Sequence, residues 1–545
     1  MQSKHKVVGA GRGKTNAPPF AAGNETPRTS NAGTAARSRT RLHVISALAA
    51  VGVTAAAPAA HAELTISTAA TKNVTCSNGV CTATTKTATL NASTLQTMLA
   101  SGNVKVATGS TAKQIVVSAD LGWATSSVLT LDANESVTVY YPISITGLGG
   151  LDIVTNDGGR GGTFSFVGAG GHVNFANLSS SLTINGAAYA LAGNIATLAS
   201  DIKTNPAGYY ALANSYDASA DGTYAGSPIA TTISGAFEGL GNAISNLSIS
   251  DAHASDGSVG FFATVGSSAL VENVGLLEMN LKDQEPYSNV GALAGTNEGT
   301  IQGISLSGTV RGKLNSSIGG VVGLNDGNIF NAYATDGVYV QKNKTSVWAG
   351  ALVGENGGSI SNSFATGTVS VSGAQAIVGA LVGFNGGTII TSLATGAVSG
   401  ASQALVGGLV GANGGEIDNS YATGAAAGGA SANVGGLVGF NAGMVLGAYS
   451  TGAPGGKTGS TIGGLIGNDQ SVSGSLKDTY WDTTTSGISD TSKGAGNISN
   501  DPGVTGLSTA QLQSGLPTGF AKKVWGENST LNGGLPYLLS NPPPS

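Results

Sequence analysis

The sequence has 545 residues, of which 86 are glycine and only 10% are charged. This composition is unusual for a globular enzyme and typical of a chain with many tight corners. Residues 1–62 contain 8 of the 24 basic residues and 1 of the 29 acidic residues. The rest of the chain therefore has 16 basic and 28 acidic residues, and a net charge of −12. An acidic chain of this kind disfavours DNA, RNA and anionic lipid as partners.

Residues 1–62 predict a secretory signal peptide with an extended basic N-terminal region. Residues 1–41 are polar and basic, and residues 42–62 form a short, alanine-rich apolar run that ends in Ala60-His61-Ala62. We expect cleavage between Ala62 and Glu63. The apolar run is too short for a membrane span, so no integral membrane segment is expected in the mature chain. The alternative is a disordered basic tail.

Residues 63–125 are expected to cap the N-terminal end of the fold and to cover its edges. They hold both cysteines, Cys76 and Cys81, on either side of Asn78-Gly79, a strong hairpin signal. In an oxidising compartment a Cys76–Cys81 disulfide would close this hairpin. Free thiols and a metal site remain alternatives, although two cysteines without a neighbouring histidine make a poor zinc site.

Residues 126–234 show short alternating runs such as Val128-Leu129-Thr130-Leu131, which predict irregular coils of β-strand. One helix is expected in this region, within residues 181–198.

Residues 235–487 contain a repeated phrase whose most regular copy is Gly435-Gly436-Leu437-Val438-Gly439-Phe440-Asn441. The first glycines of successive copies stand 28 to 31 residues apart, a period typical of solenoids. The copies are Gly291–Asn297, Gly319–Asn325, Gly350–Asn356, Gly379–Asn385, Gly407–Asn413, Gly435–Asn441 and a degenerate one, Gly463–Asp469.

Each unit contains short extended runs bounded by Gly, Asn and Asp, and it cannot bury an apolar face alone. If each unit is one coil of a parallel β-helix, equivalent residues stack about 4.8 Å apart. The leucines 352, 381, 409, 437 and 465 would then form one interior column, and Tyr421 and Tyr449 would join Phe364 and Leu393 in a second. Six asparagines would form a hydrogen-bonded ladder at a turn, namely Asn297, Asn325, Asn356, Asn385, Asn413 and Asn441.

Units of the form G-G-L-V-G-x-N-x-G-x-I followed by S-Y-A-T-G resemble the GLUG repeat. The resemblance covers residues 291–467 and extends back to about Phe237. GLUG repeats occur in large secreted bacterial surface proteins, including filamentous-haemagglutinin-like adhesins, and in some IgA-specific metallopeptidases. The resemblance therefore implies a Gram-negative surface or secreted protein.

The pattern decays after residue 467. Tyr480-Trp481-Asp482 is expected to form a bulkier unit that closes the array, and residues 488–545 are expected to form a C-terminal cap with a Pro-rich tail. Ser508–Leu512 predicts a short helix, and Gly533–Leu538 predicts an edge strand.

Residues with catalytic chemistry are few. The chain after residue 62 has two histidines, His172 and His253, and it has neither an H-E-x-x-H nor a G-x-S-x-G motif. Glu298, Asp326 and Glu355 fall near equivalent turns and could line one edge, but solvated turns are the simpler interpretation. No catalytic residue, cofactor or metal site is predicted, and the Gly-Asp turns near Asp152 and Asp157 do not repeat as a calcium roll would.

The sequence thus predicts an all-β, right-handed parallel β-helix of units of about 28 residues with capping segments at both ends. Its expected role is structural or adhesive at the cell surface or outside the cell, with no catalytic centre. The expected partner is a host, abiotic or cell-surface receptor such as a glycan, and an outer-membrane secretion partner is a further candidate. Two alternatives stay open: a carbohydrate-active enzyme on the same scaffold, and a fragment of a larger two-partner-secreted adhesin.

Overall fold

A computed structural model describes residues 62–159, 161–168, 170–252, 257–313, 315–335, 337–340 and 347–543. All of them belong to one compact unit, residues 47–545. The predicted signal segment before Ala62 lies outside the described residues, as does His253.

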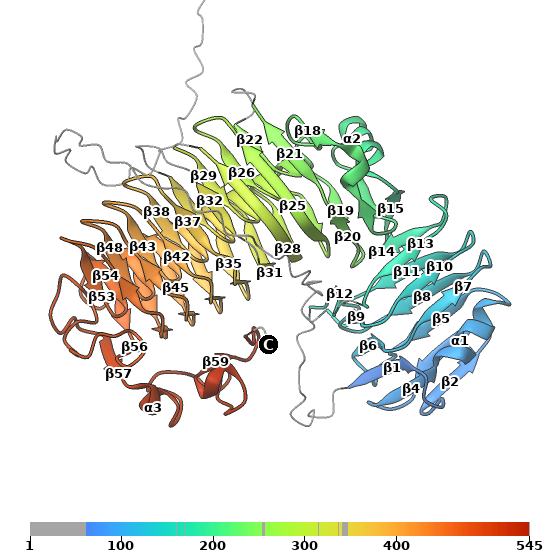
Figure 1. Ribbon diagram of the computed structural model, residues 1–545. Coiled ribbons are helices and arrows are strands. Elements are labelled where there is room, and N and C mark those ends of the chain that lie inside the picture. Colours follow the sequence, from blue (N-terminus) through green and yellow to red (C-terminus); the bar gives the residue numbers. More distant parts are fainter. Residues whose placement is uncertain are drawn as a thin grey trace, which may run out of the picture. The chain divides into compact units, whose positions relative to one another are not determined.

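The repeats form a parallel β-solenoid, as the sequence predicted. Successive units pair strand by strand in parallel register, so that one unit makes one coil (Figure 1). The first strand of each repeated phrase builds sheet I, which consists of β22 (Ser258–Val259), β26 (Asn289–Gly291), β29 (Ser317–Gly319), β33 (Trp348–Gly350), β38 (Ile377–Gly379), β43 (Leu405–Gly407), β48 (Asn433–Gly435) and β53 (Thr461–Gly463).

The second strand of each phrase builds sheet II. Its members are β23 (Phe262–Val265), β27 (Ala294–Asn297), β30 (Val322–Asn325), β34 (Val353–Asn356), β39 (Val382–Asn385), β44 (Val410–Asn413), β49 (Val438–Asn441) and β54 (Ile466–Asp469). The corner between the two sheets requires glycine because a Cβ at Gly379 would collide with the carbonyl oxygen of Val382. The glycines of the phrase therefore mark a close approach of two backbones.

The remaining strands of the coils form sheet III. In the repeats these are β28 (Thr300–Gly312), β31 (Asn328–Ala334), β32 (Val338–Val340), β35 (Ser359–Ser361), β36 (Phe364–Ala365), β37 (Val369–Val371), β40 (Thr388–Ile390), β41 (Leu393–Ala394), β42 (Val398–Ser399), β45 (Glu416–Asp418), β46 (Tyr421–Ala422), β47 (Ala426–Ala427), β50 (Met444–Leu446), β51 (Tyr449–Ser450), β52 (Pro454–Gly455), β55 (Leu476–Lys477), β56 (Thr479–Asp482) and β57 (Val504–Leu507).

Parallel coils continue before the repeats, where the sequence has lost the repeated phrase. These strands are β1 (Glu63–Ser67), β4 (Ala88–Asn91), β5 (Val104–Ala107), β6 (Gln114–Val117), β7 (Leu121–Trp123), β8 (Val128–Asp132), β9 (Val137–Val139), β10 (Ile143–Ile145), β11 (Gly150–Val154), β12 (Phe164–Phe166), β13 (Val173–Phe175), β14 (Leu182–Ile184), β15 (Ala187–Ala192), β16 (Tyr209–Leu212), β17 (Tyr216–Asp217), β18 (Thr223–Tyr224), β19 (Ala236–Glu238), β20 (Ala243–Ser245), β21 (Ser248–Asp251), β24 (Leu270–Glu272) and β25 (Gly275–Asp283).

Residues 63–125 contribute parallel strands of this solenoid together with an antiparallel hairpin, β2 (Val74–Ser77) and β3 (Val80–Ala83). They also contain helix α1 (Ala92–Leu99), whose N-cap Asn91 accepts a hydrogen bond from the Thr94 amide.

The helix expected within residues 181–198 begins later, as α2 (Ile195–Thr204), and strands β14 and β15 precede it. The side chain of Asn194 caps α2. The Asn185-Gly186 turn joins the two strands, so this part of the expected helix forms a β-hairpin instead. A short helix α3 (Thr509–Leu512) begins with a capping box of Ser508 and Gln511, in agreement with the sequence.

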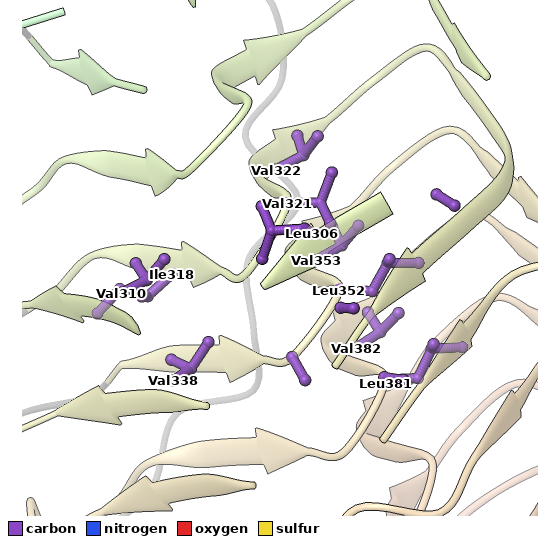
Figure 2. Packing of buried hydrophobic residues seen from close by; sticks show 14 of the residues in the cluster. Leu306, Val310, Ile318, Val321, Val322, Val338, Leu352, Val353, Leu381 and Val382 are labelled. Atoms are coloured by element: carbon purple, nitrogen blue, oxygen red, sulfur yellow. The ribbon is translucent and has the colours of Figure 1, made fainter. Parts of the chain in front are cut away.

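The interior of the repeats is filled by stacked aliphatic side chains. The predicted leucine column is confirmed, since Leu352, Leu381, Leu409, Leu437 and Leu465 are fully buried. Figure 2 shows Leu352 and Leu381 packed beside Val353 and Val382. Each buried leucine stabilises the fold by about 2 kcal/mol relative to an exposed one, but only once the neighbouring coils are in place.

Trp481 closes the interior after the last repeat. It is in register with Ser450 and is fully buried, at a position where the preceding coils have only a serine or an alanine. A Cβ at Gly464 would collide with its ring. The bulkier final unit expected from Tyr480-Trp481-Asp482 is therefore present.

Candidate functional site

The six asparagines of the repeated phrase form a continuous internal ladder. The Nδ2 of each donates to the Oδ1 of its counterpart in the next coil at 2.7–2.8 Å, from Asn297 through Asn441. All are essentially buried. The last donor, Asn441, reaches Asp469 Oδ1 at 2.8 Å. A carboxylate can accept but cannot donate, so the degenerate seventh copy ends the ladder.

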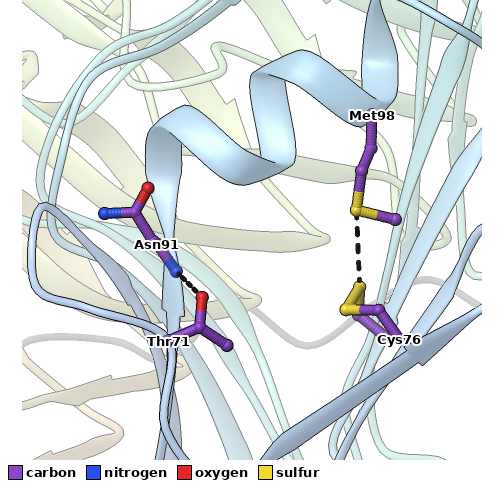
Figure 3. The surroundings of a disulfide bond; sticks show 5 residues. Thr71, Cys76, Asn91 and Met98 are labelled. Atoms are coloured by element: carbon purple, nitrogen blue, oxygen red, sulfur yellow. Dashed lines mark hydrogen bonds between the residues drawn. A yellow bond between two sulfur atoms is a disulfide. The ribbon is translucent and has the colours of Figure 1, made fainter.

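The disulfide lies at the N-terminal end of the described chain. Cys76 and Cys81 are bonded across the β2–β3 hairpin, with a Cα–Cα distance of 4.0 Å. The Sγ of Cys81 lies 3.8 Å from the Sδ of Met98 in α1 (Figure 3). The bridge therefore joins the hairpin to the packing of α1, and with both cysteines of the sequence in this bond neither is available to bind a metal.

The predicted aromatic column is present, but its expected interior position is wrong. Phe364, Leu393, Tyr421 and Tyr449 are in register along sheet III and belong to a cluster separate from the interior. The alanines after the first three, Ala365, Ala394 and Ala422, face the interior instead, and Ser450 takes the equivalent position after Tyr449. Side chains alternate along a strand, so the large side chain faces outward where the small residue after it faces the interior.

A C-terminal segment covers this outward column. Trp525 packs on Tyr421 and Tyr449, with ring centroids 6.0 and 5.8 Å apart, and its Nε1 donates to Asn419 Oδ1 at 2.9 Å. Further on, Asn541 Nδ2 donates to the carbonyl oxygens of Ser363 and Thr391. We call residues 508–543 the strap; it includes α3, β58 (Trp525–Gly526), the 3₁₀ turn η2 (Asn532–Gly534) and β59 (Tyr537–Leu538).

The strap binds a second row of turn residues that sequence reasoning missed. Asn331, Asn362, Asn419 and Asp478 adopt left-handed backbone angles, with φ between 45° and 54°. Each stands two residues before an aromatic of the outward column, and Asn362 and Asn419 accept hydrogen bonds from the strap. The recurring Asn or Asp at this spacing could have identified the turn, because these residues tolerate left-handed geometry.

A second outward surface lies where sheets I and II meet. Ile377, Leu405 and Ala412 are buried outside the interior, and three half-buried rings pack on them. Trp348 and Phe384 of successive coils stack with centroids 5.4 Å apart. We call this set the outer cluster; its members are Trp348, Ile377, Phe384, Leu405, Ala412 and Phe440.

Glu355 borders the outer cluster. Its Oε2 accepts a hydrogen bond from Ser317 Oγ at 3.1 Å, and burial raises its pKa to about 7. It pairs in register with Leu324, whereas Glu298 and Asp326 follow the ladder asparagines one residue later in their turns. Glu355 therefore does not share a row with the other two carboxylates.

A buried carboxylate pair is the chemical feature that sequence reasoning missed. Glu238 and Glu272 are in register on β19 and β24 and are 0% and 8% exposed. Glu238 accepts hydrogen bonds from the Leu240 amide and Asn273 Nδ2, and Glu272 accepts one from Gln302 Nε2. Burial raises the pKa of both carboxyls, and the charge of Glu272 raises that of Glu238 further. Two buried carboxyls of this kind favour their protonated forms, and they are sealed from a substrate.

The remaining candidates do not form a catalytic cluster. His172 is half-buried, and burial lowers its pKa. Within the described ranges, no three His, Cys, Asp or Glu side chains gather as metal ligands would. In the same part of the chain, no helix has the length and apolar character needed to span a membrane.

Comparison with known proteins matches the GLUG motif to residues 402–427. The chain is also 32% identical over 148 residues to halomucin of Haloquadratum walsbyi. That similarity covers 27% of this chain and only 1% of halomucin. The chain is therefore a parallel β-solenoid that carries a GLUG motif in its repeated part.

Proposed function

We propose that the chain is a secreted or cell-surface structural protein that mediates attachment through the outward faces of its solenoid. The observation that carries this proposal is the register of the coils. Each outward position recurs once per coil, so equivalent side chains form rows spaced at about 4.8 Å. Repeated weak contacts along such a row give avidity without a deep pocket.

Two further features support a structural role. The asparagine ladder bonds each coil of the repeats to the next, and the strap bonds to coils far from it in the sequence, as Asn541 does to Ser363. Glu238 and Glu272 are buried away from solvent, and Glu355 has no second carboxylate beside it in its row, where Leu324 and Phe384 flank it. We therefore propose a protein without a catalytic centre, with a cell-surface, host or abiotic receptor as its partner and an outer-membrane protein assisting its export.

The test combines location and attachment. Cells of the native host would be fractionated, the mature N-terminus sequenced, and a deletion strain compared with wild type for attachment to surfaces. We expect a chain that starts at Glu63, is found at the surface or in the medium, and is required for attachment. A full-length chain retained in the cytoplasm would contradict the proposal.

A further inference from the structure

The outer cluster presents two phenylalanine rings that lie two coils apart in one row. Phe384 and Phe440 are in register with Ala412, which lies on the coil between them. Two coil steps separate the rings by about 9.6 Å along the stack. Because Ala412 has only a methyl group, two half-buried rings alternate with a small side chain, while Ile377 and Leu405 fill the space beneath.

The rim of the cluster is polar and almost uncharged. The sheet I row continues from Leu405 to Asn433 and Thr461, and the sheet II row continues from Phe440 to Asn468. Among the paired positions of these two rows, Glu355 is the only charged residue. Amide, hydroxyl and carboxyl groups can exchange hydrogen bonds with a neutral polar ligand. Among the paired positions described for these two rows there is no cation that would attract an anionic polymer.

We propose that the outer cluster binds an extended, uncharged, β-linked polysaccharide laid along the stack. The inference rests on the proposed attachment function and names the class of partner at this surface. The apolar face of a sugar ring packs on an aromatic ring, while its hydroxyl groups bond to the polar rim. One coil step is comparable to the length of one sugar unit in such a chain, so rings two coils apart would contact alternate sugars.

A peptide fits this surface less well. Peptides commonly bind solenoids and sheets by adding a strand to an open edge. The internal strands of sheets I and II are already paired with a neighbouring coil on each side. These strands present rows of side chains outward. Such rows suit a ligand that is recognised through the faces of its sugar rings and through its hydroxyl groups.

The experiment measures retention of the purified full chain on insoluble cellulose and chitin and its affinity for soluble six-unit fragments of both. Phe384→Ala, Phe440→Ala and Ala412→Leu would be compared with wild type. Tyr140→Ala is the matched control, because Tyr140 is 43% exposed and lies outside the outer cluster. Unfolding midpoints identify any variant that has lost its fold.

Binding by wild type is expected, with a loss of about ten-fold for each phenylalanine variant and no change for Tyr140→Ala. Ala412→Leu makes no cavity and should lower affinity by obstructing the space between the rings. Absence of binding to both polysaccharides, or equal binding by all variants, would overturn the inference. Retention on alginate in preference to the neutral polymers would also overturn it. If the deletion strain loses attachment but the purified chain binds neither polysaccharide, this inference alone is refuted. If the chain binds a polysaccharide but the deletion strain attaches as well as wild type, the attachment function alone is refuted.

Discussion

Replacement of Asn385 by leucine tests whether the asparagine ladder stabilises the solenoid. Leucine has a similar volume, so the change removes hydrogen bonds without opening a large cavity. Asn356 Nδ2 would lose its 2.8 Å acceptor, and Asn413 Oδ1 would lose its 2.8 Å donor. Asn356 would keep only longer contacts of 3.3 Å to the carbonyl oxygens of Gly358 and Thr388.

The expected cost follows from these two buried polar groups. Each buried group left without its partner costs about 1–3 kcal/mol, so Asn385→Leu should lower the free energy of unfolding by about 4 kcal/mol. Asn328→Leu is the matched control, because Asn328 is exposed and should change stability by no more than about 0.5 kcal/mol. Equilibrium unfolding in guanidinium, followed by tryptophan fluorescence, gives both values. A cost for Asn385→Leu no larger than that for Asn328→Leu would refute the role of the ladder.

Three further predictions concern the strap, the carboxylate pair and the disulfide. Trp525→Ala should lower the free energy of unfolding by about 3–5 kcal/mol, because it removes the cover of Tyr421 and Tyr449 and the bond to Asn419; a loss below about 1 kcal/mol in the same unfolding assay would show that the strap is not packed there. Glu238 and Glu272 have pKa values raised above the ordinary 4.5, so the stability they contribute is fully present below pH 4.5 and is lost as pH rises through the raised values. Unfolding midpoints measured from pH 4 to pH 9 should fall less steeply for Glu272→Gln than for wild type, and an identical slope would contradict the raised pKa of this buried pair. Reduction of Cys76–Cys81 should cost only about 2 kcal/mol because the closed loop is short, and global unfolding on reduction would contradict this estimate.

The repeat made the architecture predictable because one physical constraint recurs in every unit. Gly379 and its equivalents have no room for a side chain, and Asn385 and its equivalents must both donate and accept. Residues under such constraints recur at the same position of every unit, so the sequence shows them with a fixed period. The leucine and asparagine columns followed directly from that period.

Features that depend on pairing between distant segments could not be predicted in this way. The phrase Tyr421-Ala422 fits either face of a strand, and only the strap, about 100 residues later, decides that the tyrosine faces outward. Glu238 and Glu272 lie outside the regular phrase, so their spacing gave no signal that they stack. Residues 63–192 form coils whose lengths vary, and without a fixed period the sequence indicated strands but not their register.

The most direct test of the account is complementation of attachment in the deletion strain of the native host. The strain would be supplied with the wild-type chain, with Tyr140→Ala, or with Asn385→Leu, and surface exposure and attachment would be measured together. We predict that the first two chains restore attachment fully and that Asn385→Leu, with its interrupted ladder, restores less. Wild-type chain displayed at the surface without any recovery of attachment would contradict the proposed function.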